Sequence, residues 1–527
     1  MYLFTAGMGI GLTGLQAAQN GINVTGQNIA NINTPGYSRQ RVNLETGFAV
    51  QIDKLQFGLG VNVNQIQSIR DRFLDMQLTQ TITRMFGTKT RYEGVENVAS
   101  LFMENGESGF GIELQRFFQS FEELSARPED DAVRTNVVTR AQTWITGLQS
   151  RYALIEEKQA QANRSVASIV NEVNTLTSEI ARLNHQIESE VPKGSDNNSR
   201  DQRQALVNKL AELVGIQVYE DTQERLTITL ENGIPIVSGT RALTMLANKT
   251  DEEGHFQVEV RLGNPGVTSL EGETIDVTSA IKSGALGGMI DLRDNLLPEQ
   301  LAQLNQLAAG VVEEVNKLHI SGYGLGTDPL QTYFFVGLDF DDNINPNLPP
   351  NGIDPDTNLP YVNGQNVAIN MDNDYKGLIK TLRVNPLVVD NPRYVASSSS
   401  YAGQFGPDDE PGPGNNMIAL RLAELQDKGD TVKYRTKDGV VTKGPFSTFI
   451  SSMANKIGNM ALKLQADANT DENVRVALEI QRDRLSAVDF DEEATNLMVY
   501  QRSYQACSRF INVINQLLDQ LINNFGR

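Results

Sequence analysis

The chain has 527 residues and a formal net charge of −20 at pH 7, with one cysteine and three histidines. A single cysteine excludes an intramolecular disulfide, and the scattered histidines do not support a metal site. The negative net charge and the lack of a Lys/Arg-rich run argue against nucleic acid as a partner. The sequence also lacks the run of roughly 20 apolar residues that would predict a membrane-spanning helix. The length predicts two to four domains.

The first residues do not fit a cleaved Sec signal. Met1-Tyr2-Leu3-Phe4 contains no basic residue, and glycines break the apolar run that follows. If this protein leaves the cell, we expect it to do so by another route.

The first predicted element is a helix over residues 10–33. Its apolar stripe consists of Leu12, Leu15, Ala18, Ile22 and Ile29. The helix should end before Thr34, because a residue that precedes proline avoids the α region, and Pro35-Gly36 then predicts a turn.

The same region contains the glycine pattern of a dinucleotide site, G-x-G-x-x-G, over residues 9–14. No acidic residue follows within thirty positions, and no second parallel strand is predicted. We therefore expect no cofactor.

The middle of the chain alternates between two hydrophobic periods. Apolar residues at steps of three and four predict long paired helices over residues 131–190, 297–318 and 446–464. Residues 216–262 have a period of two, with a hairpin signal at Asn232-Gly233, and predict a small β-rich lobe.

A proline- and asparagine-rich stretch interrupts the helical pattern over residues 325–414. It predicts a loop-rich outer segment or a small β domain. Asp339, Asp341, Asp342 and Asn343 could collect a calcium ion, but the loop lacks the glycine and the distal glutamate of an EF-hand. We interpret it as a solvated acidic loop, with no metal.

The last thirty residues carry a heptad seam of nine positions. Asp491, Glu492 and Glu493 precede it, where negative charge complements the helix dipole. The seam positions alternate strictly by four and three. They are Leu497, Tyr500, Tyr504, Cys507, Ile511, Ile514, Leu518, Leu521 and Phe525.

Because helices come first and last, we expect the two terminal helices to lie side by side. The polar face of the last helix is rich in amides, and no acidic residue precedes Glu45. One hypothesis is that both ends are mobile in the monomer and become ordered when several copies form a tube. The alternative is an ordinary intramolecular coiled coil, and periodicity alone does not decide between them.

Several segments carry a resemblance to a known family. They are Leu15-Gln16-Ala17-Ala18, residues 28–31 leading into Thr34–Gln40, Asp201–Val207, Ser283–Gly288 and, at the C-terminus, residues 491–497 with Tyr500-Gln501 and Tyr504-Gln505-Ala506. They resemble the bacterial flagellar axial proteins, and among these the family of hook-associated protein 1, the hook-filament junction proteins.

The resemblance implies a structural protein, not an enzyme. It implies an extracellular location on the flagellum, reached by the flagellar type III apparatus, and self-assembly into a ring or tube. The implied partners are further copies of the chain, the hook protein, a second hook-associated junction protein and an export chaperone. Alternatives are a hook or distal rod protein of the same class or, in another class, an enzyme with a site in the β lobe.

The expected fold class is mainly α with β-rich insertions, in a multidomain axial protein. We predict a terminal helical assembly domain (1–60 plus 487–527), a long-helix bundle (61–215 plus 281–324 plus 415–486), a β-rich lobe (216–280) and an outer insertion (325–414). The terminal helices would form a coiled-coil inner domain.

The predicted assembly interface lies at both ends of the chain. Tyr37 and Arg39 could contact a neighbouring subunit or fold back on their own helix. The full interface hypothesis comprises Leu12, Leu15, Ile22, Ile29, Asn31, Pro35, Gly36, Tyr37, Arg39, Leu497, Tyr500, Tyr504, Ile511, Ile514, Leu518, Leu521 and Phe525.

Overall fold

The computed structural model describes most of the chain. The described residues are 2–34, 36–52, 55–102, 109–189, 196–221, 224–262, 273–325, 331–337, 361–362, 365–366, 377–400, 414–427, 432–435 and 441–525. The predicted acidic loop at 339–343 and Pro35 lie outside them.

Contacts divide the chain into two compact units. Unit 1 holds residues 1–90, 164–290 and 466–527, and unit 2 holds residues 91–163 and 291–465. This division is coarser than the four domains expected from the sequence, whose boundaries stay a prediction.

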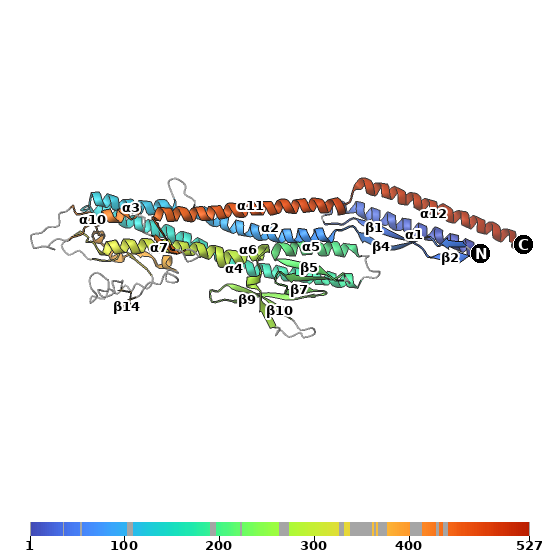
Figure 1. Ribbon diagram of the computed structural model, residues 1–527, viewed down its shortest axis with the longest axis horizontal. Helices are drawn as coiled ribbons and strands as arrows, with labels where there is room; N and C mark the ends of the chain where they lie inside the picture. The colour runs from blue at the N-terminus through green and yellow to red at the C-terminus, as the bar shows by residue number, and fades with distance from the viewer. Residues whose placement is uncertain are drawn as a thin grey trace, which may run out of the picture. The chain divides into compact units, whose positions relative to one another are not determined.

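Unit 1 contains both terminal helices and most of the strands (Figure 1). Three of its long helices, α2, α4 and α11, also contribute residues to unit 2. Its elements are α1 (Tyr2–Ala30), β1 (Gln40–Thr46), β2 (Ala49–Ile52), β3 (Leu55–Gly58), β4 (Val61–Ser68), α2 (Arg72–Ala99), α4 (Asp131–Glu188), α5 (Asn197–Leu213), β5 (Ile216–Glu220), β6 (Leu226–Leu230), β7 (Pro235–Ser238), β8 (Arg241–Ala242), β9 (Thr244–Thr250), β10 (Phe256–Leu262), β11 (Glu273–Asp276), η2 (Thr278–Ala280), α6 (Gly284–Asp291), α11 (Phe446–Ser486) and α12 (Phe490–Phe525).

Unit 2 is built from helices with short two-stranded pairings. Its further elements are η1 (Ser100–Phe102), α3 (Phe110–Ala126), η3 (Leu292–Leu296), α7 (Leu297–Ile320), β12 (Phe335–Val336), β13 (Tyr361–Val362), β14 (Gln365–Asn366), α8 (Leu378–Thr381), β15 (Arg383–Val384), α9 (Pro386–Asp390), η4 (Pro392–Tyr394), α10 (Met417–Glu424), β16 (Val432–Arg435) and β17 (Val441–Gly444).

The predicted fold class, mainly α with β-rich insertions, is confirmed. The three long helices expected from the three-and-four spacing are α4, α7 and α11. The first helix was predicted to begin at residue 10 but already begins at Tyr2, and it ends at Ala30. Helices α2, α3 and α5 were not predicted individually.

The β-rich lobe consists of two antiparallel sheets, with strand orders β5-β6-β7-β8 and β11-β10-β9. The hairpin predicted at Asn232-Gly233 joins β6 to β7, and Gly233 has a φ of 84°. Asn232 Oδ1 accepts a hydrogen bond of 3.1 Å from the Ile234 N–H, an arrangement typical of Asn in turns.

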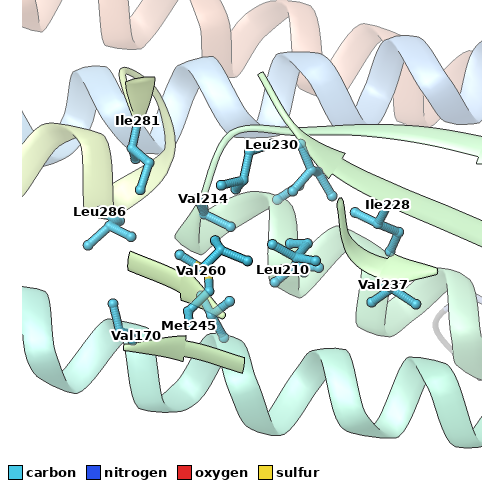
Figure 2. Packing of buried hydrophobic residues seen from close by; sticks show 14 of the residues in the cluster. Val170, Leu210, Val214, Ile228, Leu230, Val237, Met245, Val260, Ile281 and Leu286 are labelled. Atoms are coloured by element: carbon cyan, nitrogen blue, oxygen red, sulfur yellow. The ribbon is translucent and has the colours of Figure 1, made fainter. Parts of the chain in front are cut away.

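The lobe is held to the helices of unit 1 by one apolar core. Figure 2 shows Val170 of α4 and Leu210 of α5 on the helix side, and Ile228 and Val260 on strands. All four side chains are at most 1% exposed. Because burying each such side chain contributes roughly 1.5–3 kcal/mol, this core fixes the lobe on the helices.

A second ribbon, made of β1 and β4 and extended by β2 and β3, follows α1 in the chain. It was not predicted. The alternation Val61-Asn62-Val63-Asn64 is the signal that could have revealed it.

Unit 2 has an aromatic core. Phe117 of α3 stacks on Trp144 of α4 with ring centroids 6.3 Å apart, and Phe334 meets Phe335 edge to face at 4.8 Å. These four side chains are completely buried. Offset and edge-to-face ring pairs add about 0.5–1.5 kcal/mol beyond the area that they bury.

Two buried basic side chains border this core. Arg134 donates from Nη2 to Pro128 O at 2.6 Å and to Ser397 Oγ at 2.7 Å. His319 lies 2.7 Å from Thr332 O through Nδ1, while its Nε2 accepts from the Ala396 N–H at 3.0 Å. These contacts require a neutral ring with its proton on Nδ1, and burial lowers the pKa of His319 to about 4.

Candidate functional site

The two terminal helices pack against each other along their length, as predicted (Figure 1). Gly7 lies beside Ile514, Gly14 beside Cys507 and Gly21 beside Tyr500, so the helices are antiparallel. The helix pair α1–α12 is therefore formed within one chain.

Glycines on α1 allow this close approach. A Cβ atom added to Gly11 would lie 2.6 Å from Ile511, and one added to Gly21 would lie 2.5 Å from the ring of Tyr500. Such distances leave no room for a side chain, so glycine is needed here for space and not for a special φ. The G-x-G-x-x-G pattern thus lies inside a helix, where Gly11 and Gly14 face α12.

The predicted seam of α12 faces α1 within the same chain. Ile514 is 7% exposed, and Tyr500 and Ile511 are half-buried. Leu497 and Leu518 are also half-buried, whereas Tyr504 and Leu521 are exposed. The side chain of Phe525 lies outside the part that the structure describes. The seam thus packs on α1 of the same chain, and its role in contacts between copies stays a prediction.

The predicted α1 residues lie beside the glycine seam, not in it. Leu12 is 51% exposed, and Leu15, Ile22 and Ile29 are half-buried. Asn31 stabilises the turn after α1, because its Nδ2 donates to Gln27 O and its Oδ1 accepts from Thr34 Oγ1.

A hydrogen-bonded cluster joins the end of α1 to the start of α12. Asn28, only 1% exposed, accepts at Oδ1 from the Gln40 N–H (3.0 Å) and from the Tyr37 hydroxyl (2.9 Å). Its Nδ2 donates to Gln40 O (2.9 Å) and to Glu493 Oε2 (3.0 Å). We call Asn28, Tyr37, Arg39, Gln40, Glu492 and Glu493 the terminal joint.

Arg39 supplies the charge pairing of the terminal joint. Its Nε lies 2.8 Å from Glu493 Oε1, and its Nη2 lies 2.6 Å from Glu492 Oε1. The hydrogen bond with Arg39 lowers the pKa of Glu492 and raises that of Arg39. The two glutamates therefore do more than complement the dipole of α12, while Asp489 caps that helix by accepting from the Asp491 and Glu492 amides.

Tyr37 and Arg39 both make these contacts with residues of their own chain. Gly36, just before them, has a φ of 80°, a conformation that favours glycine. Burial, followed by the charges of Asp201 and Glu493, raises the pKa of Tyr37 to about 12. The Tyr37 hydroxyl is consequently neutral, and it donates a hydrogen bond to Asn28 Oδ1.

Helix α5 supports the terminal joint from the other side. Asp201 Oδ2 accepts from the Ser38 N–H at 2.9 Å, and burial raises the pKa of this carboxyl. Two residues later, buried Arg203 donates to Asn184 Oδ1 at 2.8 Å and to Glu224 O at 2.7 Å. The sequence motif at 201–207 thus positions the turn after α1.

Sequence reasoning missed an apolar stripe on α12. Val499, Phe510, Val513 and Leu517 are 55%, 45%, 51% and 47% exposed. Each of them directly precedes a seam residue in the sequence, and the regular heptad pattern of the seam alone was used to predict the apolar face of this helix. The spacing 499, 506, 510, 513, 517 is the signal that could have found them.

Helix α1 and the turn after it carry no charged side chain before Arg39. Residues 2–38 contain no Asp, Glu, Lys, Arg or His. An open groove of about 730 Å³ runs between α1 and the ribbon, lined mainly by amides such as Gln16, Asn20 and Asn62, with Glu45 at one side. Such a surface can pack on another protein without burying many charges.

Two kinds of feature are absent from the part of the chain that the structure describes. No helix in it is long and apolar enough to cross a membrane. None of its residues form a group of three or more His, Cys, Asp or Glu placed to hold a metal ion.

Family models match three parts of the chain. The flagellar hook-associated protein FlgK helical domain matches residues 95–335. The flagella basal body rod protein model matches residues 8–37, and the C-terminal model of the flagellar basal body rod FlgEFG proteins matches residues 483–524. The last two matches cover much of α1 and α12.

Relatives resemble the chain over nearly its whole length. Flagellar hook-associated protein 1 of Escherichia coli (strain K12) is 25% identical over 551 residues, covering 97% of this chain and 98% of that protein. The protein of the same name from Bacillus subtilis (strain 168) is 24% identical over 540 residues, covering 97% and 96%. The structure of the flagellar hook junction protein FlgK from Burkholderia pseudomallei matches in fold, with a TM-score of 0.59 and 16% identity over 77% of this chain and 99% of that chain.

Proposed function

We propose that this chain, a member of the flagellar hook-associated protein 1 family, is a structural subunit that joins the flagellar hook to the filament through its terminal helices. The observation that carries the proposal is the helix pair α1–α12. Its α1 is uncharged, and its α12 leaves an apolar stripe exposed after the seam has been buried. Exposed contiguous apolar surface of this kind marks an interaction site.

Other axial proteins share the terminal helices, so these do not distinguish a junction protein from a hook or rod protein. The match to the FlgK helical domain at residues 95–335 favours the junction, because the rod models match only the two ends of the chain.

The proposal includes location and partners. The subunit leaves the cell by the flagellar export apparatus, without a cleaved Sec signal, and assembles outside as a ring or short tube. Its partners are further copies, the hook protein on one side, a second hook-associated junction protein on the other, and a chaperone before export. Its work is mechanical, and no step of catalysis is part of it.

Localisation tests the proposal. Immunogold microscopy should place this chain at the boundary between hook and filament. A strain without it should build hooks that carry no filament. Gold along the hook, or loss of the hook itself, would point instead to a hook or rod protein.

A further inference from the structure

The least exposed stripe of α11 changes its chemistry along the helix. Its members recur at steps of three and four from residue 446 to residue 482. In unit 2 they are apolar, as in Phe446, Met453 and Ile457, which are 1%, 3% and 2% exposed. From residue 471 onward, in unit 1, they are Asp471, Arg475, Leu478 and Arg482. The last part of α11 therefore faces its own unit mainly with charged side chains.

The exposed side of this part of α11 is unusually aliphatic. Val476 and Ile480 are 40% and 51% exposed. At about 100° per residue they lie on the face opposite the stripe that contains Arg475 and Leu478. Among residues 466–486, all of which are described, Leu478 is the hydrophobic side chain that packs on the apolar core of unit 1, and it is only partly buried. Little apolar contact thus holds this segment on its unit.

An ion pair joins the middle of the segment to α2. Arg84 of α2 donates from Nε to Asp471 Oδ1 at 2.6 Å, so α11 lies beside α2 here (Figure 1). The Asp471 side chain is 11% exposed, whereas that of Arg84 is 59% exposed. A pair with one partner in solvent is weakened by salt and contributes less than a buried apolar stripe.

Further charges meet around Arg475. Within α11, its guanidinium lies 2.7 Å from Glu472 Oε1 and 2.6 Å from Glu479 Oε1. The hydrogen bond with Arg475 lowers the pKa of Glu472, and the charge of Lys89 on α2 acts in the same direction. Burial raises the pKa of Glu212 on α5, and the charge of Arg475 opposes that rise. Electrostatic contacts with α2 and α5 thus take the place of an apolar seam.

Both ends of the segment are held in other ways. Toward unit 2, α11 continues into the buried apolar stripe that includes Ile457. At the other end, Ser486 O accepts a hydrogen bond of 2.8 Å from the Arg39 N–H, next to the terminal joint. The stretch between these two anchors is the part of α11 that charges hold.

We infer that residues 466–486 are a strap, a helical segment that leaves α2 and α5 while the apolar core of unit 1 stays folded. Local opening is easiest where few apolar contacts must be given up. Here Leu478 leaves the core, whereas Val476 and Ile480 are already exposed. This inference concerns the conformation of the single chain, and it stands or falls independently of the proposed function.

Segment-resolved hydrogen exchange of the full-length chain tests the strap. A detached helix of this length is marginal in water, so its amides exchange when the strap opens. Amides of residues 466–486 should exchange at least about tenfold faster than those of residues 446–457 in the same helix. Raising NaCl from about 0.05 M to about 1 M should accelerate exchange in the strap at least about threefold, because salt screens its charge pairs. The core around Val170 and Leu210 should not respond.

Two matched variants locate the charge that matters. Asp471→Asn removes the partner of Arg84, so the strap should exchange at least about threefold faster in low salt and lose most of its salt dependence. Asp483→Asn makes the same chemical change at a side chain that is 58% exposed and pairs with the neighbouring Arg482, and it should exchange like the wild type. If Asp471→Asn loses helix content by circular dichroism, Arg84→Gln replaces it.

Three results would overturn the strap. The first is exchange in residues 466–486 as slow as in residues 446–457. The second is a rate in the strap that responds neither to salt nor to Asp471→Asn. The third is equal acceleration of the strap and of the core around Val170 and Leu210, since the opening would then be unfolding of the whole unit.

Discussion

At the scale of single residues, Asn28 is the centre of the terminal joint. Its amide binds the backbone of Gln40 through both N–H and C=O, and it also contacts Tyr37 and Glu493. One side chain therefore links the end of α1, the first strand and the start of α12. Replacing a buried amide that makes this many hydrogen bonds leaves several polar groups unsatisfied.

Arg39→Gln should loosen the start of α12. Glu493 is 2% exposed, so losing its cationic partner leaves a buried charge with the hydrogen bond from Asn28 as its remaining side-chain contact among the described residues, a cost of about 2–3 kcal/mol. Amide hydrogen exchange over residues 486–500 should become faster by one to two orders of magnitude, roughly as that free energy implies.

Glu492→Gln is the control for that change. Glu492 is 57% exposed, and a pair at the surface contributes at most about 1 kcal/mol. If Arg39→Gln and Glu492→Gln change the exchange rates equally, Glu493 is not the essential partner.

Unit 2 should lose stability in acid through His319. Its pKa is about 4 in the folded chain against about 6.5 unfolded, so between these values the unfolded state binds more protons. The contribution of neutral His319 to the free energy of unfolding is complete above pH 6.5 and is lost as the pH falls toward 4. At pH 5 the free energy of unfolding should be lower by about 2 kcal/mol.

Urea unfolding followed by the fluorescence of Trp144, the single tryptophan, reports on this core. The midpoint should fall from pH 7 to pH 5 in the wild type, and it should fall less in His319→Gln. Equal shifts in both proteins would show that His319 is not the group responsible.

At the scale of elements, the spacing of α1 and α12 depends on glycine. Gly21→Ala should weaken the helix pair by about 1–3 kcal/mol, because the new methyl group would meet the ring of Tyr500 at 2.5–2.6 Å. Gly26→Ala, where no atom lies within 4 Å, should instead stabilise α1 by about 0.5–1 kcal/mol. Hydrogen exchange in α1 measures both, and a loss of protection in Gly26→Ala equal to that in Gly21→Ala would contradict the close-packing explanation.

The sequence predicted these elements better than it predicted their contacts. Heptad spacing correctly located α12 and the long helices, because burial of a helix face imposes a period near 3.5. It did not show that Tyr500, Ile511 and Ile514 face α1, since a seam looks the same whether its partner belongs to the same chain or to another. The buried Asn28–Glu493 contact joins residues 465 positions apart in the sequence. A local sequence pattern cannot predict a contact between residues so far apart.

The glycines of α1 are a second feature that the apolar pattern does not reveal. Gly7, Gly11, Gly14 and Gly21 follow the same heptad spacing as the seam of α12, but glycine has no side chain to contribute to an apolar stripe. The predicted apolar stripe of this helix, Leu12, Leu15, Ala18, Ile22 and Ile29, therefore does not contain the glycines, and Leu12, Leu15 and Ile22 each follow one of them directly.

At the scale of the whole molecule, the helix pair α1–α12 differs from the apolar core of unit 1 in how much of its surface is covered. The helix pair leaves Leu12 of α1 and the apolar stripe of α12 exposed, so it should be less stable in the monomer than in the assembled state. Hydrogen exchange in α1 and α12 should be faster in the monomer than after assembly, while the core around Val170 and Leu210 exchanges slowly in both. Terminal helices as protected in the monomer as that core would contradict the hypothesis that they become ordered on assembly.

If the helix pair attaches this chain to the growing flagellum, the purified chain should bind to isolated hooks. Purified, labelled full-length chain should appear by electron microscopy at the distal ends of hooks. A variant ending at Asp489, which lacks α12, should leave those ends bare although its helix content shows that the remainder is folded. Equal occupancy of hook ends by both proteins would show that α12 is not needed for attachment.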